Sequence, residues 1–189
     1  MTAPSTKSTS FLSSSSSSLI GEENLGRLST IKRHLVPRLG SSAHKGQAGR
    51  IGVVGGCFEY TGAPYYSAIS ALHCGADLAS VFCSDNAATA IKSYSPELMV
   101  YPIFRDDALD PAADDTERAL AIESARKKFR DVLPRLHVLV VGPGLGRNPA
   151  TLEGAKRIIA DAREKDLPII LDGVGPHAPP FFFFFFFFF

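Results

Sequence analysis

Two glycine-rich segments of this sequence could bind a ligand through their backbones. One is GGCFEYTGAP, over residues 55–64, and the other is GPGLGRN, over residues 142–148. Backbone without side chains lets a ligand approach closely, and its N–H groups can point at an anion. Neither segment has the dinucleotide spacing G-x-G-x-x-G, and the chain has no Gly-Lys-Ser/Thr phosphate loop. By spacing alone, each segment is as typical of a tight turn as of a ligand site.

The hydrophobic pattern places both segments between a strand and a helix. From Arg50 onward, short apolar runs alternate with helical patterns, which is typical of a parallel sheet covered by helices. The expected strands are RIGVVGG, DLASVFC, ELMVYPI, HVLVVG and LPIILD, and the expected helices lie in residues 60–76, 86–94, 114–133 and 148–165. Both glycine segments therefore follow strands, at the edge where open α/β sheets bind ligands. The predicted fold class is α/β.

Helix signals support this order. Pro64 suits a first helical position, Gly75 a helix end and Asn148 an N-cap. In residues 114–133 acidic residues come early and basic residues late, as the helix dipole prefers. The side chains expected to face the core are Ile122, Ala125, Phe129 and Val132 in this helix, and Leu152, Ala155, Ile159 and Ala162 in the last one.

The two ends of the chain differ from its body. Residues 1–25 contain the tract SSSSSS and are predicted to be a disordered Ser-rich leader. Residues 173–189 form an aberrant Pro/Gly and poly-Phe tail, in which Phe181–Phe189 is a run too short to span a bilayer as a helix. The interpretation is that residues 26–172 carry the folded domain.

Charge and cysteine usage exclude several classes of function. The chain has 20 Lys and Arg against 19 Asp and Glu, which gives no electrostatic footprint for nucleic acid. Cys57, Cys74 and Cys83 lie among small apolar residues, so buried free thiols in a reducing compartment are expected. Their spacing predicts no metal site.

Four longer stretches carry a family resemblance. HKGQAGRIGVVGG, EYTGAPYYSAISALHCGADLASVFC, IKSYSPELMVYP and LPRLHVLVVGPGLGR resemble successive blocks of the ATP-dependent (S)-NAD(P)H-hydrate dehydratase family, from about His44 to Asp172. The resemblance implies a three-layer ribokinase-like domain with a mainly parallel sheet, truncated here after the fifth strand. It also implies a carbon–oxygen lyase that repairs hydrated NADH or NADPH by removing water, with ATP and Mg²⁺ as cofactors.

The resemblance also implies roles for individual residues. Gly146 would contact the hydrated cofactor, and Gly144 would shape the loop that presents it. Tyr60 and Thr61 would line the same cleft, although a helix cap is an equal interpretation for Thr61. Lys45, in HKGQ, is a cation near the first strand, and a solvated lysine is the favoured interpretation.

The sequence departs from the family after Asp172. The family continues there as D-A-D and later carries an N-x-x-E segment, a K-G segment and a G-x-G-D loop whose aspartate is the base; here GVGPHAPP follows. The catalytic residues are therefore unknown, and the chain as written is expected to be inactive. The alternative is a non-catalytic isoform or fragment that binds hydrated dinucleotide or an intact subunit.

Partners and location are expected from the same considerations. A small-molecule substrate is predicted, with no nucleic acid and no membrane, and a homo-oligomer is compatible with the sequence. A cytoplasmic protein is expected. The alternative is a mitochondrial or plastid protein, because transit peptides are rich in Ser and poor in acidic residues, as this leader is until Glu22.

Overall fold

The computed structural model describes Gly26, residues 44–110 and residues 112–172. The Ser-rich leader and the poly-Phe tail lie outside the described residues. The account that follows concerns the body formed from residue 44 onward.

The body is built on a sheet of five parallel strands. These are β1 (Arg50–Val54), β2 (Leu78–Ser84), β3 (Met99–Phe104), β4 (Val138–Val141) and β5 (Ile169–Leu171). Their order in space is β3-β2-β1-β4-β5, and every neighbouring pair is parallel. The predicted α/β class and its five strands are confirmed. Parallel neighbours need crossover connections, and helices supply them here.

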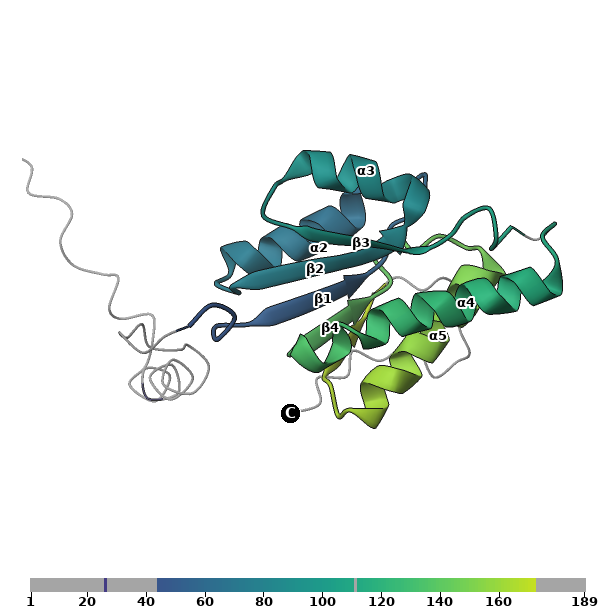
Figure 1. The fold of residues 1–189 in the computed structure, drawn as a ribbon. Helices are drawn as coiled ribbons and strands as arrows, with labels where there is room; N and C mark the ends of the chain where they lie inside the picture. The colour runs from purple at the N-terminus through teal and green to yellow at the C-terminus, as the bar shows by residue number, and fades with distance from the viewer. Residues whose placement is uncertain (1–25, 27–43, 111, 173–189) are drawn as a thin grey trace, which may run out of the picture. The chain divides into compact units, whose positions relative to one another are not determined.

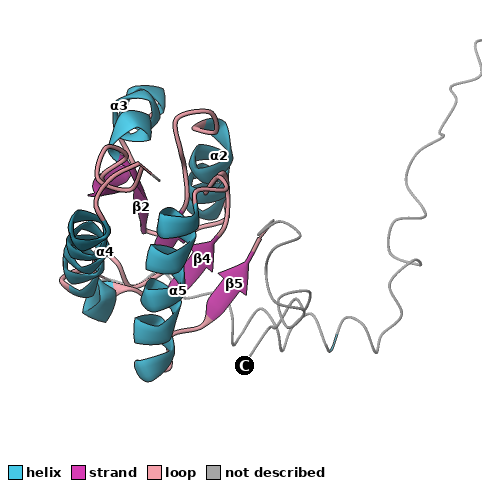
Figure 2. Ribbon diagram, turned by 90° about the vertical axis from the view of Figure 1, so that its right-hand side faces the viewer, coloured by secondary structure: helices cyan, strands magenta, loops and turns pink. Residues whose placement is uncertain are grey.

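Helices cover both faces of this sheet. They are α2 (Gly62–His73), α3 (Asp85–Tyr94), α4 (Asp115–Arg130) and α5 (Pro149–Glu164), with a short 3₁₀ turn at Leu133–Arg135. Figure 1 shows α2 and α3 together on one side of the sheet and α4 and α5 together on the other. Figure 2 shows the strands between these helices from a second direction. The domain therefore has three layers.

Alternation along the central strands supplies both halves of the core. Val53 packs with Val81 and Cys83 on the side of α2 and α3. The next residue, Val54, packs with Phe82 on the side of α4 and α5. Strands buried on both faces read as continuous apolar runs, which explains the sequence pattern.

Side-chain caps fix where three of the helices begin. The hydroxyl of Ser84 accepts from the Ala87 N–H, and the carboxylate of Asp114 accepts from the Thr116 N–H. Asn148 caps α5 as predicted. Pro64 is buried in the third position of α2 rather than the first, because the helix already begins at Gly62.

The buried face of α5 differs in part from the prediction. Ala155 and Ala162 are buried as expected, but Ile158 is the fully buried large residue of this helix. Leu152 and Ile159 are half-buried at the margin of the core. Asp161 also lies on this buried face: it is 2% exposed and forms ion pairs with Arg126 and Arg130 on α4.

No helix in the described part of the chain is long and apolar enough to cross a membrane.

Candidate functional site

The two glycine segments meet at the centre of the sheet. One follows β1 and the other follows β4, and these two strands are neighbours. From β1 the chain proceeds to β2 on one side, whereas from β4 it proceeds to β5 on the other. Such a reversal is a topological switch point, where open α/β sheets bind ligands. The fold therefore brings both predicted segments to one site.

Direct backbone contacts join the two loops. The Gly56 N–H donates to the Gly144 carbonyl over 3.1 Å. A Cβ added at Gly55 would lie 2.0 Å from the Pro143 carbonyl oxygen, closer than real atoms approach. The Gly142 N–H donates to the Val54 carbonyl over 3.0 Å. The loops form one continuous wall because small residues let the backbones touch.

Gly144 and Gly146 both have left-handed backbones, with φ of +63° and +79°. A Cβ at Gly144 would lie 2.6 Å from the carbonyl oxygen of Tyr60, and a Cβ at Gly146 would lie 3.0 Å from the sulfur of Cys57. L-residues rarely adopt this backbone. The prediction that Gly144 shapes the loop agrees with this geometry, and each glycine lies against a residue of the first loop.

A tight turn fills the tip of the first loop. The Tyr60 N–H donates to the Cys57 carbonyl over 3.1 Å, and the Cys57 thiol donates to the Glu59 carboxylate over 3.1 Å. Partial burial, followed by the hydrogen bond to Glu59, raises the pKa of Cys57. Both effects favour the protonated thiol, which is a weaker nucleophile than the thiolate.

Tyr60 and Thr61 both lie at this site. Tyr60 is 60% exposed, and its backbone lies against Gly144. Thr61 occupies the N-cap position of α2 but makes no side-chain cap hydrogen bond. Its hydroxyl instead pairs with the Tyr94 hydroxyl over 2.7 Å. The helix-cap interpretation of Thr61 is therefore wrong for its side chain, because the hydroxyl bonds to Tyr94 at the end of α3 and not to the N–H groups of α2.

Asn148 is more than a helix cap. Its side-chain oxygen accepts from the N–H groups of Ala150 and Thr151, while its amide donates to the Leu109 carbonyl over 2.9 Å. The second glycine loop is thereby tied to the segment that follows β3. The sequence indicated the cap, but nothing in it indicated the contact with Leu109.

Sequence reasoning missed a pair of acids at the same edge of the sheet. Asp85 follows β2 and Asp106 follows β3, and the Asp106 N–H donates to the Asp85 carboxylate over 3.1 Å. Within the described residues, the Oδ2 atom of Asp106 is buried without a hydrogen-bond partner. Desolvation raises the pKa of Asp106, and the nearby Asp85 charge raises it further. The sequence signal that could have found these two acids is that each lies just after a strand.

Lys45 lies at the opposite edge of the sheet. It is exposed and precedes β1, in a turn whose Gly46 and Ala48 N–H groups both donate to the Asp77 carboxylate over 2.9 Å. The solvated interpretation agrees with this position. Asp172, by contrast, lies at the ligand edge, where its N–H donates to the Val141 carbonyl over 2.9 Å and its side chain is exposed.

The prediction of three buried thiols is wrong for two of them. Cys83 is buried, and burial raises its pKa to about 12. Cys57 is half-buried beside Gly146, and Cys74 is exposed just after α2. Small neighbouring residues in the sequence indicate strands and helix ends. They do not show whether a cysteine at such a position is buried or faces water.

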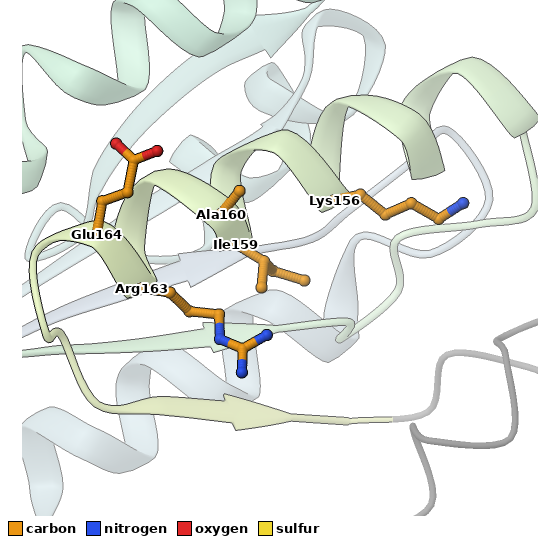
Figure 3. A pocket seen from close by; sticks show the side chains of 5 residues that line it. All are labelled: Lys156, Ile159, Ala160, Arg163 and Glu164. Carbon is orange, nitrogen blue, oxygen red and sulfur yellow. The ribbon is translucent and has the colours of Figure 1, made fainter.

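A hollow of about 550 Å³ lies elsewhere, along α5. Figure 3 shows its lining along that helix: Lys156, Ile159, Ala160, Arg163 and Glu164. These residues belong to the second half of α5, whereas the glycine loop precedes its first turn. The backbone geometry at the switch point therefore identifies the candidate site better than this hollow does.

The described residues form no metal site from protein side chains alone. Across residues 44–110 and 112–172 there is no group of three or more His, Cys, Asp or Glu side chains that could hold a metal ion. Mg²⁺ in nucleotide sites usually takes one or two carboxylates together with the phosphates of the bound nucleotide. ATP and Mg²⁺, which the resemblance implies, therefore stay a prediction for this part of the chain.

A parallel sheet between two helix pairs, with glycine loops at the switch point, defines a doubly wound α/β domain and agrees with the predicted ribokinase-like fold. A ribokinase-like superfamily protein from Enterococcus faecalis has this fold: it is 21% identical with a TM-score of 0.50, over 72% of this chain and 40% of that one. The model of the NAD(P)H-hydrate dehydratase family matches residues 51–176. The chain belongs to this family, and the predicted resemblance is confirmed.

Curated relatives agree with the family match. The ATP-dependent (S)-NAD(P)H-hydrate dehydratase of Pongo abelii is 51% identical over 143 residues, which are 76% of this chain and 39% of the relative. That of Nematostella vectensis is 50% identical over 143 residues, 76% of this chain and 36% of the relative. The chain thus spans well under half the length of these relatives.

Proposed function

We propose that this chain binds hydrated NADH or NADPH and supplies the substrate-binding part of an ATP-dependent (S)-NAD(P)H-hydrate dehydratase. One observation carries the proposal: two glycine loops of the family's sequence pattern are locked together at the switch point, with Gly144 and Gly146 in left-handed backbone. The names of the relatives supply the substrate class.

The described residues support binding and orientation. The small residues of the two loops let a dinucleotide lie close to the backbone. Tyr60, whose backbone lies against Gly144, is exposed and carries a ring and a hydroxyl that a ligand could contact. The thiol of Cys57 and the carboxylate of Glu59 are paired with each other. The loops therefore hold the substrate, and they contribute no general base.

In the proposed reaction, ATP hydrolysis supplies the free energy for removing water from the substrate. The described residues contain no cluster of three or more metal-ligating side chains, so we assign Mg²⁺ to none of them. The expected activity of this chain by itself is binding without turnover. The proposal thus keeps the family assignment and adopts the alternative stated in the sequence analysis, a chain that binds the hydrated dinucleotide without catalysis.

Calorimetric titration of the full 189-residue chain with hydrated NADH tests the proposal. Saturable binding with one site per chain is expected, with unmodified NADH as the comparison ligand. A parallel assay with ATP and Mg²⁺ follows the return of NADH absorbance. Binding without turnover agrees with the proposal, whereas no binding contradicts it. Turnover would show that the catalytic groups are also present.

A further inference from the structure

Every strongly exposed aromatic side chain in the described part of the body lies near one helix end. These residues are Phe58, Tyr60, Tyr66 and Tyr94, which are 73%, 60%, 68% and 46% exposed. They come from the loop after β1, the second turn of α2 and the last turn of α3. Exposed aromatic groups of this kind mark binding surfaces more often than scattered single residues do.

Three of the rings form a connected ledge, which we define as Tyr65, Tyr66 and Tyr94. The Tyr65 ring lies 5.3 Å from that of Tyr66 and 5.2 Å from that of Tyr94, centre to centre, with interplanar angles of 62° and 64°. Such edge-to-face contacts hold rings in fixed orientations. The hydrogen bond between the Tyr94 and Thr61 hydroxyls fixes the ledge further.

The ledge adjoins the glycine loops. A Cβ added at Gly62 would lie 3.9 Å from the Tyr66 ring, so this ring lies over the first turn of α2. Thr61 touches Tyr94, and the preceding residue, Tyr60, lies against Gly144. A ligand at Gly144 can therefore extend over α2 onto the ledge without leaving the surface.

The chemistry of the proposed substrate selects which of its rings would stack there. Hydration removes a carbon–carbon double bond from the dihydronicotinamide ring, which then puckers. Adenine is left as the one aromatic ring of the molecule. Aromatic side chains bind bases of any sequence by stacking on their flat faces. A ledge of tyrosines thus favours the adenine end.

We propose that the Tyr65–Tyr66–Tyr94 ledge binds the adenine base of the hydrated dinucleotide and leaves the damaged ring to the loop at Gly146. This inference rests on the function proposed above. It assigns an orientation to the substrate and gives NADH and NADPH forms the same anchor, because both carry adenine.

Calorimetry on the full chain with ADP-ribose, which carries adenine but no nicotinamide, tests the ledge. ADP-ribose is expected to bind, and Tyr66→Ala is expected to weaken it about tenfold. Tyr94→Phe, which keeps the ring, should retain most of the affinity. Leu120→Ala removes an equally exposed apolar side chain from α4 and should change nothing.

The outcomes separate this inference from the proposed function. If hydrated NADH binds and Tyr66→Ala leaves both ligands unaffected, the ledge inference is wrong while the function stands. If hydrated NADH does not bind the unaltered chain, the function itself fails. If light scattering shows a dimer that Tyr66→Ala dissociates, a second copy of the chain covers the ledge, and the adenine inference is overturned.

Discussion

Gly144 and Gly146 share a left-handed backbone, but their neighbours differ in how far they can move. A side chain at Gly146 would press on the Cys57 thiol, which can rotate away. A side chain at Gly144 would press on the backbone carbonyl of Tyr60, which is held in a turn by its own N–H. The loop geometry therefore depends more strictly on Gly144.

We expect Gly144→Ala to lower the free energy of unfolding by about 3 kcal/mol and Gly146→Ala by about 1–2 kcal/mol. The smaller value is the left-handed backbone penalty alone. Urea unfolding of the full chain, followed by circular dichroism, measures both. Gly62→Ala is the matched control, because its Cβ meets nothing closer than 3.9 Å and helical alanine is favourable. Equal losses at Gly144 and Gly146 would contradict this account.

Asp106 predicts a pH dependence. Its raised pKa, caused first by desolvation and then by Asp85, means that the folded state favours the protonated acid. The penalty for ionising it is fully present above the folded pKa and disappears below the unfolded value. Asp106→Asn should therefore stabilise the chain at neutral pH, by less than about 1 kcal/mol because water screens the pair.

Melting temperatures measured across the acid range check this sign. The gain from Asp106→Asn should shrink to nothing as the pH falls below the ordinary Asp pKa. Asp107→Asn is the control with the opposite sign, since the ion pair with Arg105 lowers the pKa of Asp107. A destabilised Asp106→Asn chain at neutral pH would show that the Asp106 charge is favourable.

At the scale of elements, a buried carboxylate joins α4 to α5. Asp161 is 2% exposed and accepts from Arg126 over 2.8 and 2.7 Å and from Arg130 over 2.5 Å. Burial alone would raise the pKa of Asp161, but the two guanidinium groups outweigh it and hold the pKa below its usual value. The helices are thus joined by charge as well as by apolar contact.

Asp161→Ala should cost about 2 kcal/mol of unfolding free energy, since charge-assisted hydrogen bonds are lost while the freed arginines can still reach water. Glu164→Ala, an exposed acid one turn further along α5, is the control and should be close to neutral. The stabilisation from Asp161 should also fade as the pH falls through its folded pKa. Full retention of stability in Asp161→Ala would contradict a joining role for this acid.

The order of elements was predictable because hydrophobic period and helix caps are local signals. Asn148 and Gly75 mark helix boundaries in the sequence as they do in the fold. The inward turn of Asp161 was not predictable, because its partners are more than thirty residues away on α4. The hydrogen bond between the Thr61 and Tyr94 hydroxyls also joins residues far apart in the sequence. Local rules for helix caps therefore predicted the wrong partner for the Thr61 side chain.

At the scale of the whole molecule, the described residues form one sheet with the ligand edge at its centre. The strongest contacts of the site join loops about ninety residues apart in sequence, such as Gly56 with Gly144. The chain matches about 39% of the length of the Pongo abelii relative. The chain therefore carries the family's sequence pattern over this part of its length, and the proposed function concerns binding by this part.

The most direct test is amide NMR of the ¹⁵N-labelled full chain titrated with hydrated NADH. The account predicts shifts concentrated in residues 55–61 and 142–148, with Gly144 and Gly146 among those most affected. Unmodified NADH should shift the same amides less at equal concentration. Shifts confined to the hollow around Ile159 on α5, or no shifts at all, would contradict a binding site at the two glycine loops.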